Sequence, residues 1–489
     1  MIITRRWFPL LVCLLVSLAS FTERALGDRP NIVLVMADDQ GWGDMAYYGH
    51  PVLKTPNFDK AAAAGLRFDQ FYAAAPVCSP TRASVMTGRH PNRMGVFKWG
   101  YPMRPQEVTI AEALKSAGYA TAHFGKWHLG SVRRKSPANP GRNGFDQWLS
   151  APNFYDNDPV LSQLGKAVQQ RGESSIVAAD AALAWMKRQV TGDTPFFAVV
   201  WFGSPHGPHR AVEADRALYD DQPKNKQHFY GEITGMDRAF GKIRDGLQQL
   251  GVRDNTILWY CSDNGALPRV GSTGGLRGNK GKVYEGGLKV PAILEWPAEI
   301  KSHRKINTRC NTCDIYPTLL ELAEVKVDRQ PVLDGVSLAD VIDGQQTVRK
   351  RGMGFWDFPI GGISTPSAKW MAELLKAQQA GGDLEPHPSS QQAAKLPDPP
   401  YSESAFPGHA AWIAGDWKLH RIENKQGGKV TWELYDLAKD PDELKNEYGN
   451  PSYAAVVAEL KGELARLQKE TGDDTDMRAM SKEWRAKYR

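Results

Sequence analysis

A cysteine stands in one short stretch whose residue types could do chemistry. The segment PVCSPTRASVMTGR, residues 76–89, places Cys78 where a helix could begin, and Arg82 follows four positions later. The unpaired N–H groups at a helix start carry a positive partial charge, which suits a bound anion. Cys78 is therefore either a small buried residue or a reactive centre, and other parts of the chain must decide between these interpretations.

Four apolar, strand-like runs each end in side chains that can bind a metal or move protons. These side chains are Asp38 with Asp39, Lys126 with His128, His206, and Asp263 with Asn264. Helical patterns lie between the runs, and this alternation predicts a mostly parallel sheet with helices on both faces. Function in such sheets gathers just beyond the carboxyl ends of the strands, so we expect one site there.

The acidic members of this set predict a site for a hard cation. Asp38, Asp39, Asp263 and Asn264 offer only oxygen ligands, which Ca²⁺ and Mg²⁺ prefer. Adjacent aspartates alone are typical of a solvated loop, and SDNG alone is typical of a turn. Both motifs at strand ends in one chain favour the metal site.

An extended Lys-Trp-His run, residues 126–128, would place its lysine and histidine on one side of the chain.

The segment CSPTR resembles the Cys/Ser-x-Pro-x-Arg signature of type I sulfatases, the formylglycine-dependent branch of the alkaline-phosphatase superfamily. The segments ADDQGWGD, GKWHLG, SPHGPH, SDNG and GNKGKVYEGG also resemble that family and occur in its order. The segments GDWKL and ELYDLAKDPDE extend the resemblance almost to the end, whereas residues 357–408 show none. The resemblance implies an α/β fold with a mostly parallel or mixed central sheet and a smaller C-terminal antiparallel sheet with a helix.

For Cys78 the resemblance implies oxidation to Cα-formylglycine by a formylglycine-generating or anaerobic sulfatase-maturing enzyme. The hydrated aldehyde offers two hydroxyls on one carbon, so one can attack sulfur and the other can later expel sulfate. The implied reaction converts a sulfate ester to an alcohol and inorganic sulfate through a formylglycine-sulfate intermediate. The resemblance also favours one Ca²⁺ ion over Mg²⁺, bound by residue 78 together with the four oxygen ligands.

The resemblance implies roles for five further side chains. Arg82 would neutralise the metal-bound alkoxide, Lys126 would bind a sulfate oxygen, and His128 would take a proton from the second hydroxyl. His206 would protonate the leaving oxygen. Lys280, which directly precedes the Gly-x-x-Tyr-Glu-Gly-Gly run, would contact the bridging and non-bridging sulfate oxygens.

Substrate recognition is expected from loops, because loops on a rigid scaffold commonly set specificity. His209 and Asn153 are candidate substrate-binding residues, and the candidate recognition segments are residues 153–162 and 357–408. The expected substrate is a sulfated small molecule or glycan. Two other interpretations stay open: a phosphonate monoester hydrolase or phosphodiesterase of the same superfamily, and a non-catalytic protein that binds sulfated glycans with Cys78 unmodified.

The N-terminal sequence and the composition of the chain indicate its cellular location and its class of partner. Residues 1–27 begin with Arg5 and Arg6, continue with a short apolar run and end in Ala-Leu-Gly, which predicts a signal peptide. Export to a periplasm, cell surface or medium follows, and no later stretch is apolar enough for a membrane span. The net charge is +6, and the sequence contains no dense basic run. The absence of such a run argues against nucleic acid as a partner, and the mild positive charge suits an anionic substrate.

We expect a catalytic domain over residues 28–356, an irregular insertion over 357–408 and a C-terminal α+β subdomain over 409–489. Thr55 and the Thr109/Glu112 capping box mark expected helix starts. Cys310 and Cys313 form a C-x-x-C pair, which is either a local disulfide or two buried thiols.

Overall fold

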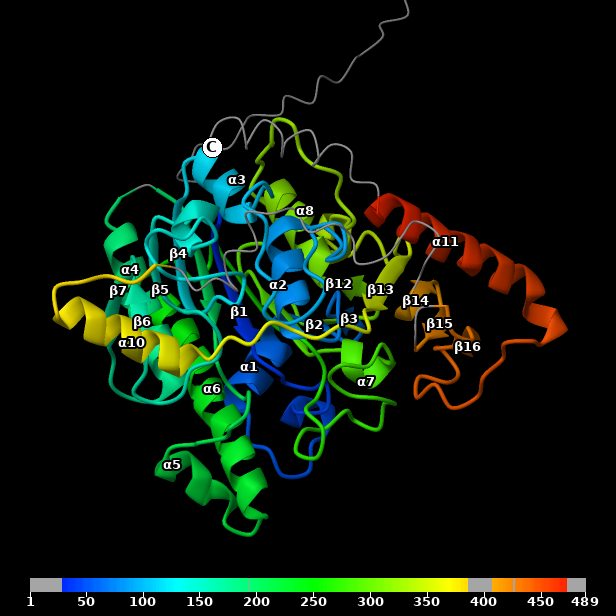
Figure 1. Ribbon diagram of the computed structural model, residues 1–489, viewed down its shortest axis with the longest axis horizontal. Helices are drawn as coiled ribbons and strands as arrows, with labels where there is room; N and C mark the ends of the chain where they lie inside the picture. The colour runs from blue at the N-terminus through cyan, green and yellow to red at the C-terminus, as the bar shows by residue number, and fades with distance from the viewer. Residues whose placement is uncertain (1–28, 193, 386–406, 425–426, 473–489) are drawn as a thin grey trace, which may run out of the picture.

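The computed structural model describes residues 29–472 except 193, 386–406 and 425–426, so the predicted signal peptide lies outside the described residues. Its main feature is a large mixed sheet flanked by helices (Figure 1). Among the described residues the strand order is β11 (Arg304–Ile306), β2 (Leu66–Phe68), β10 (Ala292–Glu295), β9 (Thr256–Ser262), β1 (Asn31–Ala37), β8 (Phe196–Trp201), β4 (Ala120–Lys126), β5 (Gln147–Ala151), β6 (Val160–Gln163) and β7 (Lys166–Gln169).

The five central strands β9, β1, β8, β4 and β5 are parallel, so their carboxyl ends lie along one edge of the sheet. Strand β1 is buried on both faces because its odd and even side chains enter two separate hydrophobic cores. The predicted α/β fold with a mostly parallel or mixed central sheet is therefore confirmed.

Helices cover both faces of the sheet. The core on one face includes side chains of α1 (Pro56–Ala64), α4 (Ser174–Gln189) and α6 (Lys224–Gln249). The core on the other face includes side chains of α2 (Cys78–Thr87), α3 (Ile110–Ser116), α8 (Ile315–Leu322) and α9 (Ala339–Ile342). Shorter elements are β3 (Phe71–Tyr72), β12 (Cys310–Asn311), α5 (Glu213–Arg216) and α7 (Glu285–Leu288). Among the helices that the structure describes, none has the length and hydropathy needed to cross a bilayer.

Local sequence signals account for several of these boundaries. The capping box of α3 is present, because the Glu112 N–H donates to Thr109 Oγ1 (3.1 Å) and the Thr109 N–H donates to Glu112 Oε2 (2.8 Å). Thr55 is the residue before α1, as expected, but its hydroxyl bonds to Asp59 Oδ1 rather than to a backbone N–H of the helix.

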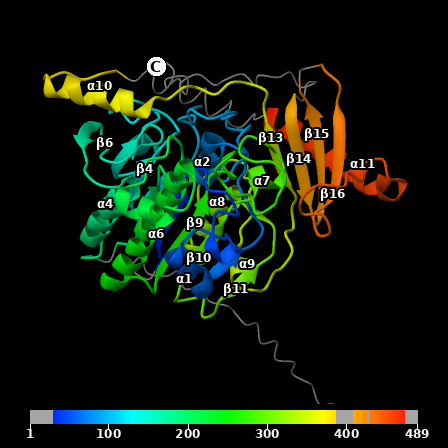
Figure 2. The same cartoon turned by 90° about the horizontal axis from the view of Figure 1, so that it is seen from below.

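A second, smaller sheet contains β13 (Met353–Asp357), β14 (Gly408–Ala414), β15 (Trp417–Glu423) and β16 (Thr431–Asp436), all antiparallel. Helix α11 (Ala454–Gly472) packs on one face, and the other face packs against residues near β3 and α7 of the main domain. Figure 2 shows this small sheet beside the main sheet, with α11 on the far side. Its first strand ends at Asp357 and its second begins at Gly408, so the sheet takes strands from both ends of the expected insertion.

The prediction of an irregular segment over 357–408 is wrong over residues 367–379, which form helix α10 (Ser367–Gln379). Trp370, Met371 and Leu374 are buried at helical spacing, and the surrounding proline, serine and glycine residues obscured this short pattern. The four cysteines in the described residues are free and buried, which supports two buried thiols at Cys310 and Cys313 rather than a disulfide.

Replacing Gly88 with alanine is expected to destabilise the helix that begins at Cys78. Gly88 ends α2 with φ of +70°, and an added Cβ would lie 2.9 Å from the Cβ of buried Tyr316. The strained backbone and the crowding together should lower the free energy of unfolding by about 2–4 kcal/mol. Chemical denaturation measures this effect. The control, Gly462→Ala in α11, has open space around the new methyl group and should be neutral or stabilise by up to about 1 kcal/mol. Equal stability of the two variants would contradict the prediction.

Candidate active site

Backbone hydrogen bonds that involve the candidate metal ligands themselves join the carboxyl ends of β1, β8 and β9. The Asp38 N–H donates to the Ser204 carbonyl (2.9 Å), and the Asp263 N–H donates to the Ala37 carbonyl (3.2 Å). Asp39 has a left-handed backbone with φ of +74°, which aspartate tolerates better than most residues. This turn lets the Asp39 N–H donate to Asp263 Oδ1 (3.0 Å). The two acidic segments are therefore fixed against each other.

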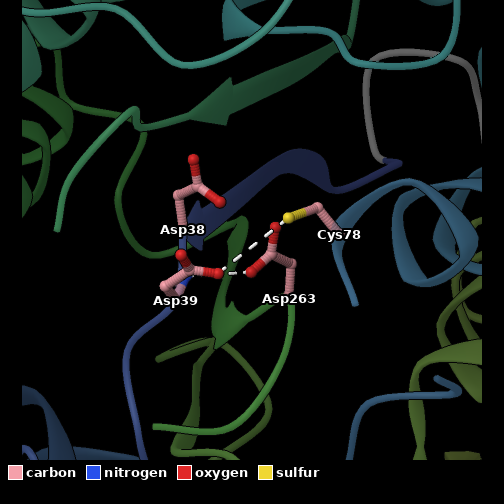
Figure 3. A group of neighbouring side chains, drawn as sticks. All are labelled: Asp38, Asp39, Cys78 and Asp263. Atoms are coloured by element: carbon pink, nitrogen blue, oxygen red, sulfur yellow. Dashed lines mark hydrogen bonds between the residues drawn. The ribbon is translucent and has the colours of Figure 1, made fainter. Parts of the chain in front are cut away.

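Figure 3 shows the resulting cluster of Asp38, Asp39, Asp263 and Cys78. Each offers one ligand atom, and these atoms all lie within 4.8 Å of one another. The fifth predicted ligand, Asn264, donates from Nδ2 to Asp39 Oδ1 (2.9 Å), while its buried Oδ1 has no hydrogen-bond partner among the described residues. A set of carboxylate oxygens with an unpartnered amide oxygen suits a hard cation. The residues present therefore fit the expected metal.

Each carboxylate of the cluster accepts hydrogen bonds from a different cationic side chain. Lys126 Nζ donates to both carboxylate oxygens of Asp38 (2.8 and 2.7 Å), and Lys280 Nζ donates to Asp39 Oδ2 (2.7 Å). Arg82 donates from Nε and Nη2 to Asp263 Oδ2 (3.0 and 2.7 Å).

The three carboxylates and three cations balance, so a bound divalent cation would leave the site with a net positive charge. A positive site that lies at a helix start suits an anionic group.

Burial and neighbouring charge shift the pKa values of two aspartates in opposite directions. Burial raises the pKa of Asp38, against the opposing charges of Lys126 and Arg82. Burial would also raise the pKa of Asp39, but Lys280, His206 and Lys126 hold that pKa well below its usual range. Of these two carboxylates, Asp39 is therefore the one more firmly held in its charged form.

Cys78 is the first residue of α2 and is 1% exposed. The turn before it is closed by Thr81, whose hydroxyl donates to the Ala75 carbonyl (2.9 Å). Ser79 Oγ accepts a hydrogen bond from the Gly100 N–H (2.8 Å), which ties a second loop to the helix start. Burial raises the pKa of the Cys78 thiol to about 12. In this arrangement the thiol is protonated at neutral pH.

The expected extended conformation of residues 126–128 is wrong at its last position. Strand β4 ends at Lys126, and His128 has a left-handed backbone with φ of +53°. The turn nevertheless keeps His128 buried near Lys126 and Arg82, and neither ring nitrogen has a hydrogen-bond partner in the part of the chain that the structure describes. Burial and these two cations hold the pKa of His128 well below 6.5, so the ring is neutral and can accept a proton.

His206 also faces the acidic cluster. Its Nδ1 lies 2.6 Å from the Gly207 carbonyl and must donate to it, while Nε2 lies 3.7 Å from Asp39 Oδ2. The ring of Phe154 stacks on it with a centroid distance of 4.8 Å. Burial lowers the pKa of His206 to about 4. Nε2 is therefore the nitrogen available for proton exchange.

The two candidate substrate-binding residues have other contacts. His209 Nδ1 lies 3.1 Å from Glu232 Oε2 on α6, and among the described residues no hydrogen bond or ion pair joins it to the acidic cluster. Asn153 Nδ2 donates to the Thr365 carbonyl (3.2 Å), which places it against the segment that precedes α10. Sequence reasoning missed Trp201, whose ring lies 5.0 Å from the Arg82 guanidinium, because its only signal is its place at a strand end.

Two family models match this chain, and known proteins resemble it over much of its length. A family model described as Sulfatase matches residues 30–325, and one described as N-sulphoglucosamine sulphohydrolase, C-terminal, matches residues 403–470. The chain is 34% identical over 372 residues to N-acetylgalactosamine-6-sulfatase from Canis lupus familiaris, covering 68% of this chain and 70% of the relative. It is 31% identical over 476 residues to an ulvan-active sulfatase from Formosa agariphila, covering 91% of this chain and 82% of the relative.

A solved structure, Ps i-CgsB in complex with k-i-k-neocarrahexaose, superposes with a TM-score of 0.75 at 22% identity and covers 94% of this chain and 98% of that one. At this identity the likeness shows a shared fold.

Proposed function

Because the chain belongs to the sulfatase family and is a sulfuric ester hydrolase, we propose that it is an exported, calcium-dependent enzyme that desulfates a carbohydrate with a formylglycine made from Cys78. The observation that carries this proposal is the place of Cys78 at the start of α2, inside a buried cluster of three carboxylates and three cations. The predicted signal peptide supports export, and export is compatible with modification by a maturation enzyme.

The oxygen ligands Asp38, Asp39, Asp263 and Asn264 would hold the Ca²⁺ ion together with residue 78. When bound, the cation polarises the sulfate group and stabilises negative charge on oxygen. Arg82 stays paired with Asp263 and adds positive charge beside residue 78. Lys126 and Lys280 lie at the same cluster, where their ammonium groups can bind sulfate oxygens.

The two histidines of the site, His128 and His206, would transfer the protons of the reaction. Formylglycine supplies, as its hydrate, two hydroxyl groups on one carbon in place of a thiol. The neutral ring of His128 can accept a proton from such a hydroxyl group. His206 keeps its Nδ1 proton on the Gly207 carbonyl, so Nε2 would carry the proton that the leaving oxygen receives. The negative charge of a bound sulfate ester would raise the pKa of His206 above its low value in the free protein and so favour this protonated form.

Names of relatives support a carbohydrate substrate. One relative is named for ulvan and another for N-acetylgalactosamine. We therefore propose a sulfated glycan as the substrate class.

The test is to express the chain together with a formylglycine-generating enzyme and measure sulfate release from a panel of sulfated saccharides and aryl sulfates. We expect higher kcat/KM for sulfate esters than for matched phosphate and phosphonate esters. No sulfate release from any member, with formylglycine at residue 78 verified by mass spectrometry, would contradict the proposal.

Replacing His206 with alanine is expected to lower kcat in a way that depends on the leaving group. An alcohol leaving group needs a proton, so kcat for a saccharide sulfate should fall by about 10²-fold or more. Para-nitrophenol leaves readily as its anion, so the loss on para-nitrophenyl sulfate should be much smaller. Steady-state rates on the two substrates measure the difference, with exposed His303→Ala beside β11 as the control. Equal losses on both substrates would exclude His206 as the proton donor.

A further inference from the structure

A chain of buried polar side chains runs through the small sheet toward its contact with the main domain. His409 Nε2, from β14, lies 2.8 Å from His420 Nδ1, from β15, and His420 Nε2 lies 2.6 Å from Glu443 Oε1. His420 and Glu443 are fully buried, whereas His409 is half-buried. None of the proposed catalytic or metal-binding roles involves these three residues.

The contacts of Glu443 fix the direction of these hydrogen bonds. Lys418 Nζ lies 3.1 Å from Glu443 Oε1, and the Glu285 N–H donates to Glu443 Oε2 (2.6 Å), so both oxygens face donors and the group is a carboxylate. His420 therefore donates from Nε2 and accepts at Nδ1. His409 must then donate from Nε2, which leaves its Nδ1 as a hydrogen-bond acceptor. Nδ1 has no hydrogen-bond partner among residues 29–472 so far as the structure describes them.

This acceptor lies beside loops that are tied to the segment of Cys78. Glu285 is the first residue of α7, directly after the loop that carries Lys280, and the Gly281 N–H of that loop donates to the Pro76 carbonyl (2.9 Å). Asp357 of β13 is the register partner of His409 and forms an ion pair with Lys98. Two residues after Lys98, the Gly100 N–H donates to Ser79 Oγ. Both loops therefore reach residues that flank Cys78.

Along the chain, two exposed side chains that suit a sugar lie between the residues that make these contacts. Trp99 lies between Lys98 and Gly100, and Lys282 lies between Gly281 and Glu285. Trp99 is 37% exposed, and its backbone is held by the Ile363 N–H, which donates to the Trp99 carbonyl (2.9 Å). Lys282 is exposed and has no ion pair within the described part of the chain; its charge lies near His409 and Asp357. A flat aromatic face, a cation and an oriented acceptor together suit a pyranose ring with free hydroxyl groups and further anionic substituents.

We propose that Trp99, Lys282 and His409 form a rim subsite that binds a sugar ring of the substrate, with His409 Nδ1 accepting a hydrogen bond from a hydroxyl group. His420 and Glu443 are positioning residues that keep His409 in the accepting tautomer. The subsite rests on the proposed function, because it serves the same active site.

The test compares a saccharide with a substrate too small to reach the rim. Wild-type protein is first assayed on a panel of defined mono- and disaccharide O-sulfates, and the best saccharide is paired with para-nitrophenyl sulfate. For His409→Ala we expect kcat/KM for the saccharide to fall about tenfold or more, through KM, because one oriented hydrogen bond is lost. The value for para-nitrophenyl sulfate should stay within about twofold, because that ester makes no hydrogen bond to the rim. His409→Asn should restore part of the loss, because its amide oxygen can take the place of Nδ1.

Two further variants complete the design. Trp99→Ala should show the same selective loss as His409→Ala, and His303→Ala should leave both substrates unchanged. Equal losses on both substrates, or an unaffected saccharide, would overturn the subsite. Calorimetric binding of the panel to Cys78→Ala protein, with and without His409→Ala, keeps the two proposals separate. Binding that depends on His409, without turnover by matured wild type, contradicts the proposed function alone, and binding that ignores His409 contradicts the subsite.

Discussion

Alanine at position 78 is expected to reduce sulfate release at least about 10⁴-fold, the scale of loss when a covalent nucleophile is removed. Cys78 contributes little to packing beyond one small side chain at the start of α2, so the fold should survive. The expected pattern is therefore a protein with a normal unfolding temperature and no turnover. Sulfate release and thermal unfolding, measured on one preparation, check both parts.

The same experiment can separate formylglycine from a cysteine nucleophile. We expect the specific activity of wild-type preparations to rise in proportion to the fraction of residue 78 that mass spectrometry finds converted to the aldehyde. Cys310→Ala removes another fully buried thiol and should keep full activity. Full activity in a preparation whose Cys78 is entirely unconverted would contradict the role of formylglycine. Loss of folding in Cys78→Ala would instead show a structural role for the thiol.

The part of the site that the sequence predicts best is the part that strand topology controls. Asp38, Asp39 and Asp263 follow buried apolar runs, and parallel strands must bring their carboxyl ends to one edge. Lys280 could be identified only through the family resemblance, because it lies in a long loop after β9. Its contact with Asp39 depends on how that loop packs, which no local pattern encodes.

The features that sequence reasoning missed depend on long-range packing. The left-handed backbone of His128 follows from the turn after β4, whereas the residue types alone favoured an extended run. The polar chain from His409 to Glu443 joins residues from β14, β15 and the loop after β16. In the sequence alone, each of these residues is typical of an ordinary surface position. Such networks appear only when the elements are assembled.

Asparagine at position 39 is expected to abolish both activity and the stabilising effect of calcium. Asp39 contributes a carboxylate to the cluster and has a left-handed backbone, which asparagine adopts readily, so the substitution removes charge with little strain. Sulfate release should fall by about 10³-fold or more, because a ligand of the metal and the partner of Lys280 are lost together. Excess EDTA should have the same effect on wild-type activity.

Thermal unfolding gives a readout that is independent of turnover. A ligand that binds only the folded state at a hundredfold excess over its Kd adds about 2.7 kcal/mol of stability, so calcium should raise the unfolding temperature of EDTA-treated wild type by at least about 2 °C. Asp39→Asn should lose this increase. The control is Asp237→Asn, which changes a buried carboxylate that accepts hydrogen bonds from Asn57 and Phe58, away from the cluster, and should keep the increase. A full calcium shift in Asp39→Asn would place the ion elsewhere, because the cluster would then lack one of its three carboxylates and still bind as before.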